Sequence, residues 1–121
     1  MDKKTVEDWI EGYLGAWNGN EPEEIGRLFT ADAAYYTGPF DEPWVGRESI
    51  VQEWLKRKDE PGTFGFRYDV LAASERLGVV RGWTKYFNPD REYSNIWVIK
   101  FDDQGRCEEF TEWWVRKPVK G

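Results

Sequence analysis

A chain of 121 residues, 40% of them hydrophobic, is long enough for one core and too short for two, so we expect a single domain, residues 1–121. The net charge of −6 argues against nucleic acid and against a membrane surface as partners. The absence of histidine excludes Ser-His and Cys-His couples and imidazole metal ligands, which leaves carboxylates, Tyr, Lys and Arg for any chemistry.

Apolar residues at helical spacing predict three helices in the first half of the chain. The first occupies residues 6–17, and its apolar stripe is Val6, Trp9, Tyr13 and Trp17. A short second helix is expected to begin after Asn20, which can cap it, with Pro22 in its first turn. A third is expected over residues 50–55, before the run "KRKDEPG" ends the pattern.

Strands follow the helices in the chain. A brief strand is expected at residues 33–37, before a loop rich in Pro and Gly. After Thr63 the alternation predicts four long strands, in the runs "FGFRYDVLA", "VVRGWTKYF", "YSNIWVIKF" and "CEEFTEWWVR". Turns are expected near Gly78, at "NPDRE" and at "DDQGR". This order indicates an α+β domain in which a curved antiparallel sheet wraps the helical layer.

The last predicted strand contains a carboxylate between aromatic residues. Alternation places Phe110, Glu112 and Trp114 on one face, and it places the other set on the opposite face: Cys107, Glu109, Thr111 and Trp113. A carboxylate between rings loses hydration, so its pKa rises and it can exchange protons near neutrality. The alternative is a Glu112 that is solvated at a pocket mouth or paired with an Arg or Tyr for structure. Cys107 is expected to be a buried, unreactive thiol.

Two segments, Tyr13–Ile50 and Phe101–Trp114, together resemble the nuclear transport factor 2-like (NTF2-like) superfamily, specifically its SnoaL-like branch. The shared features are a Trp-Asn turn, "LFTADA", a Gly before the third helix and a "DxxGR" hairpin, in this order. The resemblance implies an NTF2-like cone-shaped barrel with three N-terminal helices against a curved, mostly antiparallel sheet. It also implies an apolar pocket at the open end and an outer sheet face that often forms dimers.

The resemblance does not choose a reaction, because the superfamily contains polyketide cyclases, steroid isomerases, dehydratases, epoxide hydrolases and transport factors. In the steroid isomerase pattern the proton-transferring Asp falls at Thr37 and a strand acid falls near Trp97, so both carboxylates are missing. An epoxide hydrolase relay would use Arg67 and Asp69 with Glu112. Arg67 and Asp69, however, alternate with the aromatic residues of the run "FGFRYDVLA", so they are expected to face solvent or a partner subunit.

The family's inward face on the last strand makes Glu112 the candidate acid/base residue, with Tyr13 as its hydrogen-bond donor. Tyr13 can also be read as a packed ring whose hydroxyl is tied to a neighbour. A pocket for a ligand would be lined by Trp17, Tyr35, Trp54, Asn95, Trp97, Phe110 and Trp114. Trp44, in the loop, could cover the mouth or anchor the loop to the core. No metal or organic cofactor is expected.

Three functions stay open at this point. The first is a small-molecule-binding domain whose aromatic-lined pocket takes a small apolar or aromatic ligand. The second is a cofactor-independent acid/base enzyme of isomerase, cyclase or lyase type that acts through Glu112. The third is a dimeric interaction protein whose cavity is filled by its own Trp side chains, and cavity volume would separate it from the others. A homodimer through the outer sheet face, with Trp113 and Trp83, and a cytoplasmic location are also expected.

Overall fold

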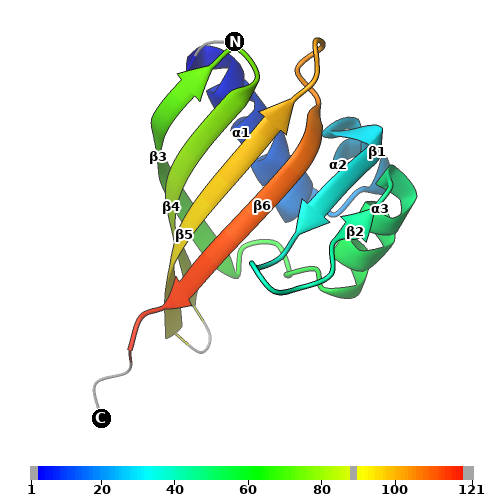
Figure 1. Cartoon of the computed structure of the whole chain (residues 1–121). Helices are drawn as coiled ribbons and strands as arrows, with labels where there is room; N and C mark the ends of the chain where they lie inside the picture. The colour runs from blue at the N-terminus through cyan, green and yellow to red at the C-terminus, as the bar shows by residue number, and fades with distance from the viewer. Residues whose placement is uncertain (1–2, 88–89, 119–121) are drawn as a thin grey trace.

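The computed structural model describes residues 3–87 and 90–118 and has three helices packed on one face of a curved six-stranded sheet (Figure 1). The elements are α1 (Lys3–Gly19), α2 (Pro22–Arg27), β1 (Phe29–Tyr36), β2 (Trp44–Val45), α3 (Arg47–Lys56), β3 (Phe64–Ser74), β4 (Leu77–Phe87), β5 (Asp90–Phe101) and β6 (Cys107–Arg116). The strand order is β2-β1-β6-β5-β4-β3, with β1 and β6 parallel and the other neighbouring pairs antiparallel. The sheet stays open, with β2 and β3 at its edges. The predicted α+β cone is confirmed.

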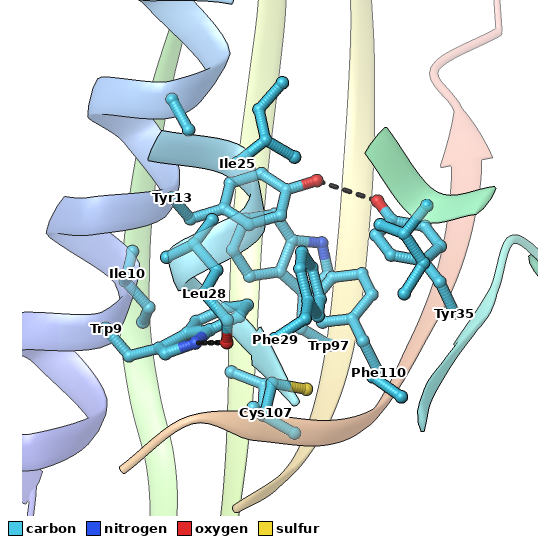
Figure 2. Packing of buried hydrophobic residues seen from close by; sticks show 14 of the residues in the cluster. Trp9, Ile10, Tyr13, Ile25, Leu28, Phe29, Tyr35, Trp97, Cys107 and Phe110 are labelled. Carbon is cyan, nitrogen blue, oxygen red and sulfur yellow. Dashed lines mark hydrogen bonds between the residues drawn. The ribbon is translucent and has the colours of Figure 1, made fainter. Parts of the chain in front are cut away.

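Helix α1 lies against the concave face because one side of it is apolar. The buried side chains are those of Val6, Trp9, Ile10, Tyr13 and Ala16, which follow the predicted stripe. Trp9 also donates its indole N–H to the carbonyl oxygen of Leu28 at 2.9 Å (Figure 2). This bond satisfies a polar group that the surrounding apolar core could not solvate.

Asn20 ends α1 and does not cap α2, so the predicted cap was wrong. Its φ of 55° is left-handed, and its backbone N–H donates to the Ala16 carbonyl at 2.8 Å. Its side-chain amide donates to the carbonyl oxygen of Asp59 at 3.0 Å. Asn tolerates this conformation at a helix C-terminus as well as it serves at an N-cap, so the residue type did not distinguish the two positions.

A bulge at the start of β6 changes which way Cys107 points. Phe101 pairs with Cys107 and Lys100 pairs with Glu109, so Glu108 has no cross-strand partner. Cys107 is therefore fully buried in the core, whereas simple alternation placed it on the outer face. The expected buried thiol is confirmed, and burial raises its pKa. Beyond the bulge, Phe110, Glu112 and Trp114 keep the predicted face.

Two predicted hairpin turns lie close to the positions expected from the sequence. The β3–β4 turn falls at residues 75–76, before Gly78, which lies inside β4. A Cβ at Gly78 would come within 2.9 Å of the Val6 side chain, so close packing against α1 explains this glycine. The "DDQGR" turn is confirmed: Asp102 Oδ1 accepts the N–H groups of Gln104 and Arg106, both at 2.9 Å.

Three further differences concern element boundaries. β1 starts at Phe29, earlier than predicted, and a register shift lies between Phe29 and Ala34. The short strand β2 forms within the segment that was expected to be a loop. The predicted "NPDRE" turn lies partly outside the described residues, and from Asp90 onward its residues already belong to β5.

Aromatic rings fill the core around Trp97, whose side chain is 1% exposed (Figure 2). Its ring lies 4.6 Å from that of Tyr13 and 5.3 Å from that of Phe110. It stacks on Phe66 with centroids 4.9 Å apart and an interplanar angle of 14°. Rings packed in this way stabilise the fold beyond the area that they bury.

The outer face of the sheet also carries tryptophans. Trp113 is 55% exposed, and the half-buried Trp83 lies under the guanidinium groups of Arg67 and Arg81, at 4.7 and 5.1 Å from the ring centroid. Arg67 and Asp69 are exposed on this face, as alternation predicted. The expected homodimer through this face stays a prediction.

Gly82 should be intolerant of a larger side chain, because a Cβ there would lie 2.4 and 2.5 Å from ring atoms of Phe66. Phe66 is held between Trp97 and Trp17, so it cannot move aside freely. We expect Gly82→Ala to lower the free energy of unfolding by about 1–3 kcal/mol, measured by urea denaturation with far-UV circular dichroism. The control is Gly15→Ala on the exposed side of α1, where a Cβ meets no atom within 4 Å. It should stabilise by roughly 0.5–1 kcal/mol. Equal stability of Gly82→Ala and the parent would contradict this account.

Candidate active site

A cavity of about 460 Å³ lies between the sheet and the C-terminal half of α1, at the end of the cone where β4 and β6 end. Eight aromatic side chains line it: Tyr13, Trp17, Tyr35, Trp44, Trp54, Tyr86, Tyr93 and Trp114. Polar and charged groups from β4, β5, β6 and the segments after β1 and α3 complete the wall. This size and composition match the sites that hold small organic molecules.

Glu112 lies half-buried in the wall of this cavity. The register places it directly opposite Trp97, whose indole N–H donates to Glu112 Oε2 at 2.6 Å. The amide of Asn95 donates to the same oxygen at 3.2 Å, and Thr84 Oγ1 donates to Asn95 Oδ1 at 2.9 Å, which fixes the orientation of that amide. Within residues 3–87 and 90–118 no donor is found for Oε1, so this oxygen stays available to a group that enters the cavity.

Two opposing effects set the pKa of Glu112. Loss of hydration in this aromatic surrounding raises the pKa above its ordinary value, and it is the larger effect. The N–H groups of Trp97 and Asn95 favour the ionised form and offset part of the rise. The result is a carboxyl group that takes up a proton more readily than an exposed glutamate does.

Tyr13 and Tyr35 form a hydroxyl pair beside the core, with their oxygens 2.8 Å apart (Figure 2). Both rings are buried, and burial raises the pKa of both hydroxyls, with the Glu112 carboxylate adding to the effect. They therefore keep their protons. Only one hydrogen is needed for the bond between them, so the second can be donated to a third group. The hydroxyl of Tyr13 is therefore bonded to Tyr35 and not to Glu112. This geometry matches the alternative in which Tyr13 is a packed ring with its hydroxyl hydrogen-bonded to a neighbouring residue.

The mouth of the cavity is held together by Asp59 and Trp44. Asp59 Oδ2 accepts the Trp17 indole N–H at 2.9 Å and the Tyr86 hydroxyl at 3.0 Å. Trp44 stacks on Tyr35 with centroids 4.6 Å apart at an angle of 14°, and it also lines the cavity. Trp44 therefore does both things that the sequence allowed: it anchors its segment to the core and forms part of the cavity mouth.

The structure brings together most of the residues that the sequence singled out. Those that line the cavity are Glu112, Tyr13, Trp17, Tyr35, Trp54, Asn95 and Trp114. Trp114 lies at the rim and is 55% exposed. Trp97 and Phe110 lie beneath the wall, with 1% and 0% of their surface exposed. Trp97 acts on the site through its bond to Glu112 and through its packing against the ring of Tyr13.

Sequence reasoning missed several polar residues of the mouth: Asp41, Arg57, Lys58, Asp59, Tyr86, Arg91 and Tyr93. Extending the alternation backward from Asn95 through Tyr93 to Arg91 would have found two of them, because every second residue shares a face. Lys58 carries no such signal, because a basic residue just after a helix is already favoured by the negative end of the helix dipole. Within the described part of the chain, no group of three or more His, Cys, Asp or Glu side chains could hold a metal ion.

Comparisons with known proteins agree with this architecture. The model of the SnoaL-like domain family matches residues 10–110. An NTF-2-like protein of unknown function from Burkholderia xenovorans LB400 superposes with a TM-score of 0.75 at 14% identity, over 98% of this chain and 88% of that one. A steroid delta-isomerase from Pseudomonas aeruginosa gives 0.66 at 21% identity, over 98% and 83%.

An epoxide hydrolase/cyclase-like enzyme, SalBIII, described in pyran ring formation in the polyether salinomycin, gives a TM-score of 0.73 at 13% identity, over 94% of this chain and 93% of that one. At these identities the solved structures show a shared fold and nothing more. A search of the curated proteins gives no match. Among the described helices, none is long and apolar enough to cross a membrane.

The raised pKa of Glu112 should make stability depend on pH with a definite sign. The folded protein holds this proton to a higher pH than the unfolded chain, so ionising Glu112 costs stability as pH rises from the ordinary value of 4.5 through the folded pKa. We expect Glu112→Gln to gain stability relative to the parent across this window. Each pH unit between the two pKa values corresponds to about 1.4 kcal/mol.

Urea midpoints of the parent and Glu112→Gln from pH 4 to 8 measure this difference. Glu109→Gln, on the other face of the same strand and paired with Lys100, is the matched control. The stability of Glu109→Gln relative to the parent should not increase as pH rises. A difference between parent and Glu112→Gln that is constant with pH would mean that the carboxylate is solvated.

Proposed function

The chain belongs to the SnoaL-like domain family, and we propose that it binds a small, planar, largely aromatic ligand in the cavity of its cone. The observation that carries this proposal is the open volume of about 460 Å³, walled by aromatic rings, with the half-buried carboxylate of Glu112 beside it. Had the tryptophans packed to native density, as in the third function considered above, no such volume would remain.

The cavity offers two kinds of contact to such a ligand. The rings of Trp17, Trp54 and Tyr86 supply rigid apolar surface, and burying a flat molecule against them is favourable at about 25 cal/mol per Å² of apolar area. Glu112 Oε1 can accept a hydrogen bond from the ligand. The spare proton of the Tyr13–Tyr35 pair can be donated to a ligand oxygen.

We expect 2-naphthol, as a flat aromatic probe, to bind the parent protein in an isothermal titration. Thr37→Trp places a ring in the cavity wall and should weaken binding by at least about tenfold, or roughly 1.4 kcal/mol. Ser74→Trp introduces the same ring at an exposed position at the end of β3 and should leave affinity unchanged. Equal affinity of Thr37→Trp and the parent would place the probe elsewhere and contradict the proposal.

Acid/base catalysis by Glu112 is the second candidate, and the raised pKa and hydrogen-bonded setting of this residue favour it. In this scheme ionised Glu112 removes a proton from a carbon next to a ligand carbonyl, the electron pair moves to the carbonyl oxygen, and the tyrosine pair donates a hydrogen bond to that oxygen. Two of the structural relatives are described as an isomerase and as a cyclase-like enzyme, which is in keeping with such chemistry.

Exchange of the α-protons of 1-indanone, a flat aromatic ketone, tests this second candidate in D₂O by proton NMR. The parent should accelerate exchange above the rate in buffer. A general base typically contributes about 10²–10⁴-fold to such a rate, and Glu112→Gln should lose this contribution. Glu109→Gln, on the outer face of β6, should keep the parent rate. Exchange at the buffer rate while 1-indanone binds would reject catalysis of this type and leave the binding proposal in place.

A further inference from the structure

We propose that the ligand of this cavity is a planar aromatic carboxylate, held through its anionic group by Arg91 and Lys58 at the mouth and through a hydrogen-bond donor by Glu112 at the other end. This inference rests on the proposed binding function and narrows it to a chemical class. It starts from two cationic groups that line the cavity and have no ion pair among the residues that the structure describes.

Arg91 is the first of these groups. It lies on the cavity face of β5, opposite Tyr86 in the register, with its guanidinium carbon 4.3 Å from the centroid of the Tyr86 ring. A stacked guanidinium keeps its N–H edge free to bond an acceptor in its own plane. The Nε atom of Arg91 is buried and has no hydrogen-bond partner among the described residues, nor does the guanidinium have an ion pair there. Buried donors without an acceptor are rare in folded proteins, so a ligand acceptor would complete this site.

Lys58 is the second group. It lines the mouth just after α3, and residues 3–87 and 90–118 provide no ion pair for it. The hydrogen bond from the Tyr86 hydroxyl to Asp59, next to Lys58 in the chain, brings the ring under Arg91 to the same part of the mouth. Both cations therefore line the same cavity. Arg57, by contrast, is already paired with Glu53 and lies over Trp44.

The acids that line the mouth are engaged by neutral donors. Asp59 Oδ2 accepts from Trp17 and Tyr86, and Asp41 Oδ2 accepts from Thr37 at 3.0 Å. Neither forms an ion pair with Arg91 or Lys58. A carboxylate on the ligand would give these two cations a charged partner, and an Arg can bind it through two parallel hydrogen bonds.

Glu112 sets the direction in which such a ligand lies. An anionic group beside an ionised Glu112 would be repelled with no cation to offset the repulsion. At the mouth, Arg57, Lys58 and Arg91 outnumber the carboxylates of Asp41 and Asp59, so the carboxylate of the ligand is placed there. The free Oε1 then faces the opposite end of the ligand, where a hydroxyl or amine can donate to it. The protein as a whole carries a charge of −6, so attraction of an anion comes from these local cations and not from net charge.

Three naphthalene probes of one ring size separate these contributions in isothermal titrations at pH 7 and low salt. 6-Hydroxy-2-naphthoate has both groups, its methyl ester has no charge, and 6-methoxy-2-naphthoate has no donor. We expect the hydroxy acid to bind the parent about tenfold more tightly than the ester, because the ester cannot form the charge-assisted hydrogen bond. The hydroxy acid should also bind more tightly than the methoxy acid, because the methoxy group has no hydrogen to donate.

Variants test which residues are responsible. Arg91→Gln and Lys58→Gln should each weaken binding of the acid while leaving the ester unchanged. Arg81→Gln makes the same change of charge on the outer face, over Trp83, and should affect neither probe. Lys58 is exposed, so its variant keeps the test valid if Arg91→Gln does not fold.

Each outcome has one meaning. Equal affinity of acid and ester for the parent overturns the carboxylate inference and leaves the binding proposal intact. If Arg81→Gln weakens binding of the hydroxy acid as much as Arg91→Gln does, the weakening comes from the change in net charge, and the proposed contact with Arg91 is wrong. Equal affinity of the hydroxy and methoxy acids overturns the role of Glu112, and no binding by any probe overturns the proposed function itself.

Discussion

The hydrogen bond from the Trp97 indole to the Glu112 carboxylate joins the core of this protein to its cavity. Trp97 is 1% exposed and stacked on Phe66, so its N–H is a fixed donor, and it meets Glu112 Oε2 at 2.6 Å. The bond exists because β5 and β6 pair with these two residues directly opposite each other. A slip of one residue would turn Glu112 to the outer face and leave a buried indole N–H without an acceptor.

The same bond explains how a carboxylate can be kept among aromatic rings. Desolvation disfavours the ionised form, whereas the N–H groups of Trp97 and Asn95 favour it, and the first effect is larger. Asn95 is in turn held by Thr84, so the donors are oriented before any ligand arrives. Glu112 Oε2 is hydrogen-bonded and Oε1 is not, so the carboxyl group can exchange a proton or accept a hydrogen bond from a ligand.

The cavity has two chemically different ends. At one end, Glu112 accepts and the Tyr13–Tyr35 pair can donate. The mouth carries two carboxylates and three cations, and two of these cations have no ion pair within the described residues. This local arrangement differs from the acidic chain as a whole. Because salt screens exposed charges beyond about 8–10 Å, a ligand within the mouth responds mainly to the groups nearest to it. Orientation of the ligand therefore follows from the cavity and not from the overall charge.

Local periodicity in the sequence was sufficient for the helical stripe of α1 and for grouping Phe110, Glu112 and Trp114 on one face, because both depend on neighbours only two to four residues away. The inward direction of that face came from the resemblance to the NTF2-like superfamily. Tertiary structure decided the rest. The bulge at Glu108 turned Cys107 into the core. Trp97 and Phe110 lie beneath the cavity wall instead of in it, because the ring of Tyr13 packs on both. Arg91 and Lys58 line the same cavity although they come from β5 and from the segment after α3, and a hydrogen bond from Tyr86 on β4 to Asp59 joins two similarly distant parts of the chain. Such contacts are set by packing, and no local pattern in the sequence encodes them.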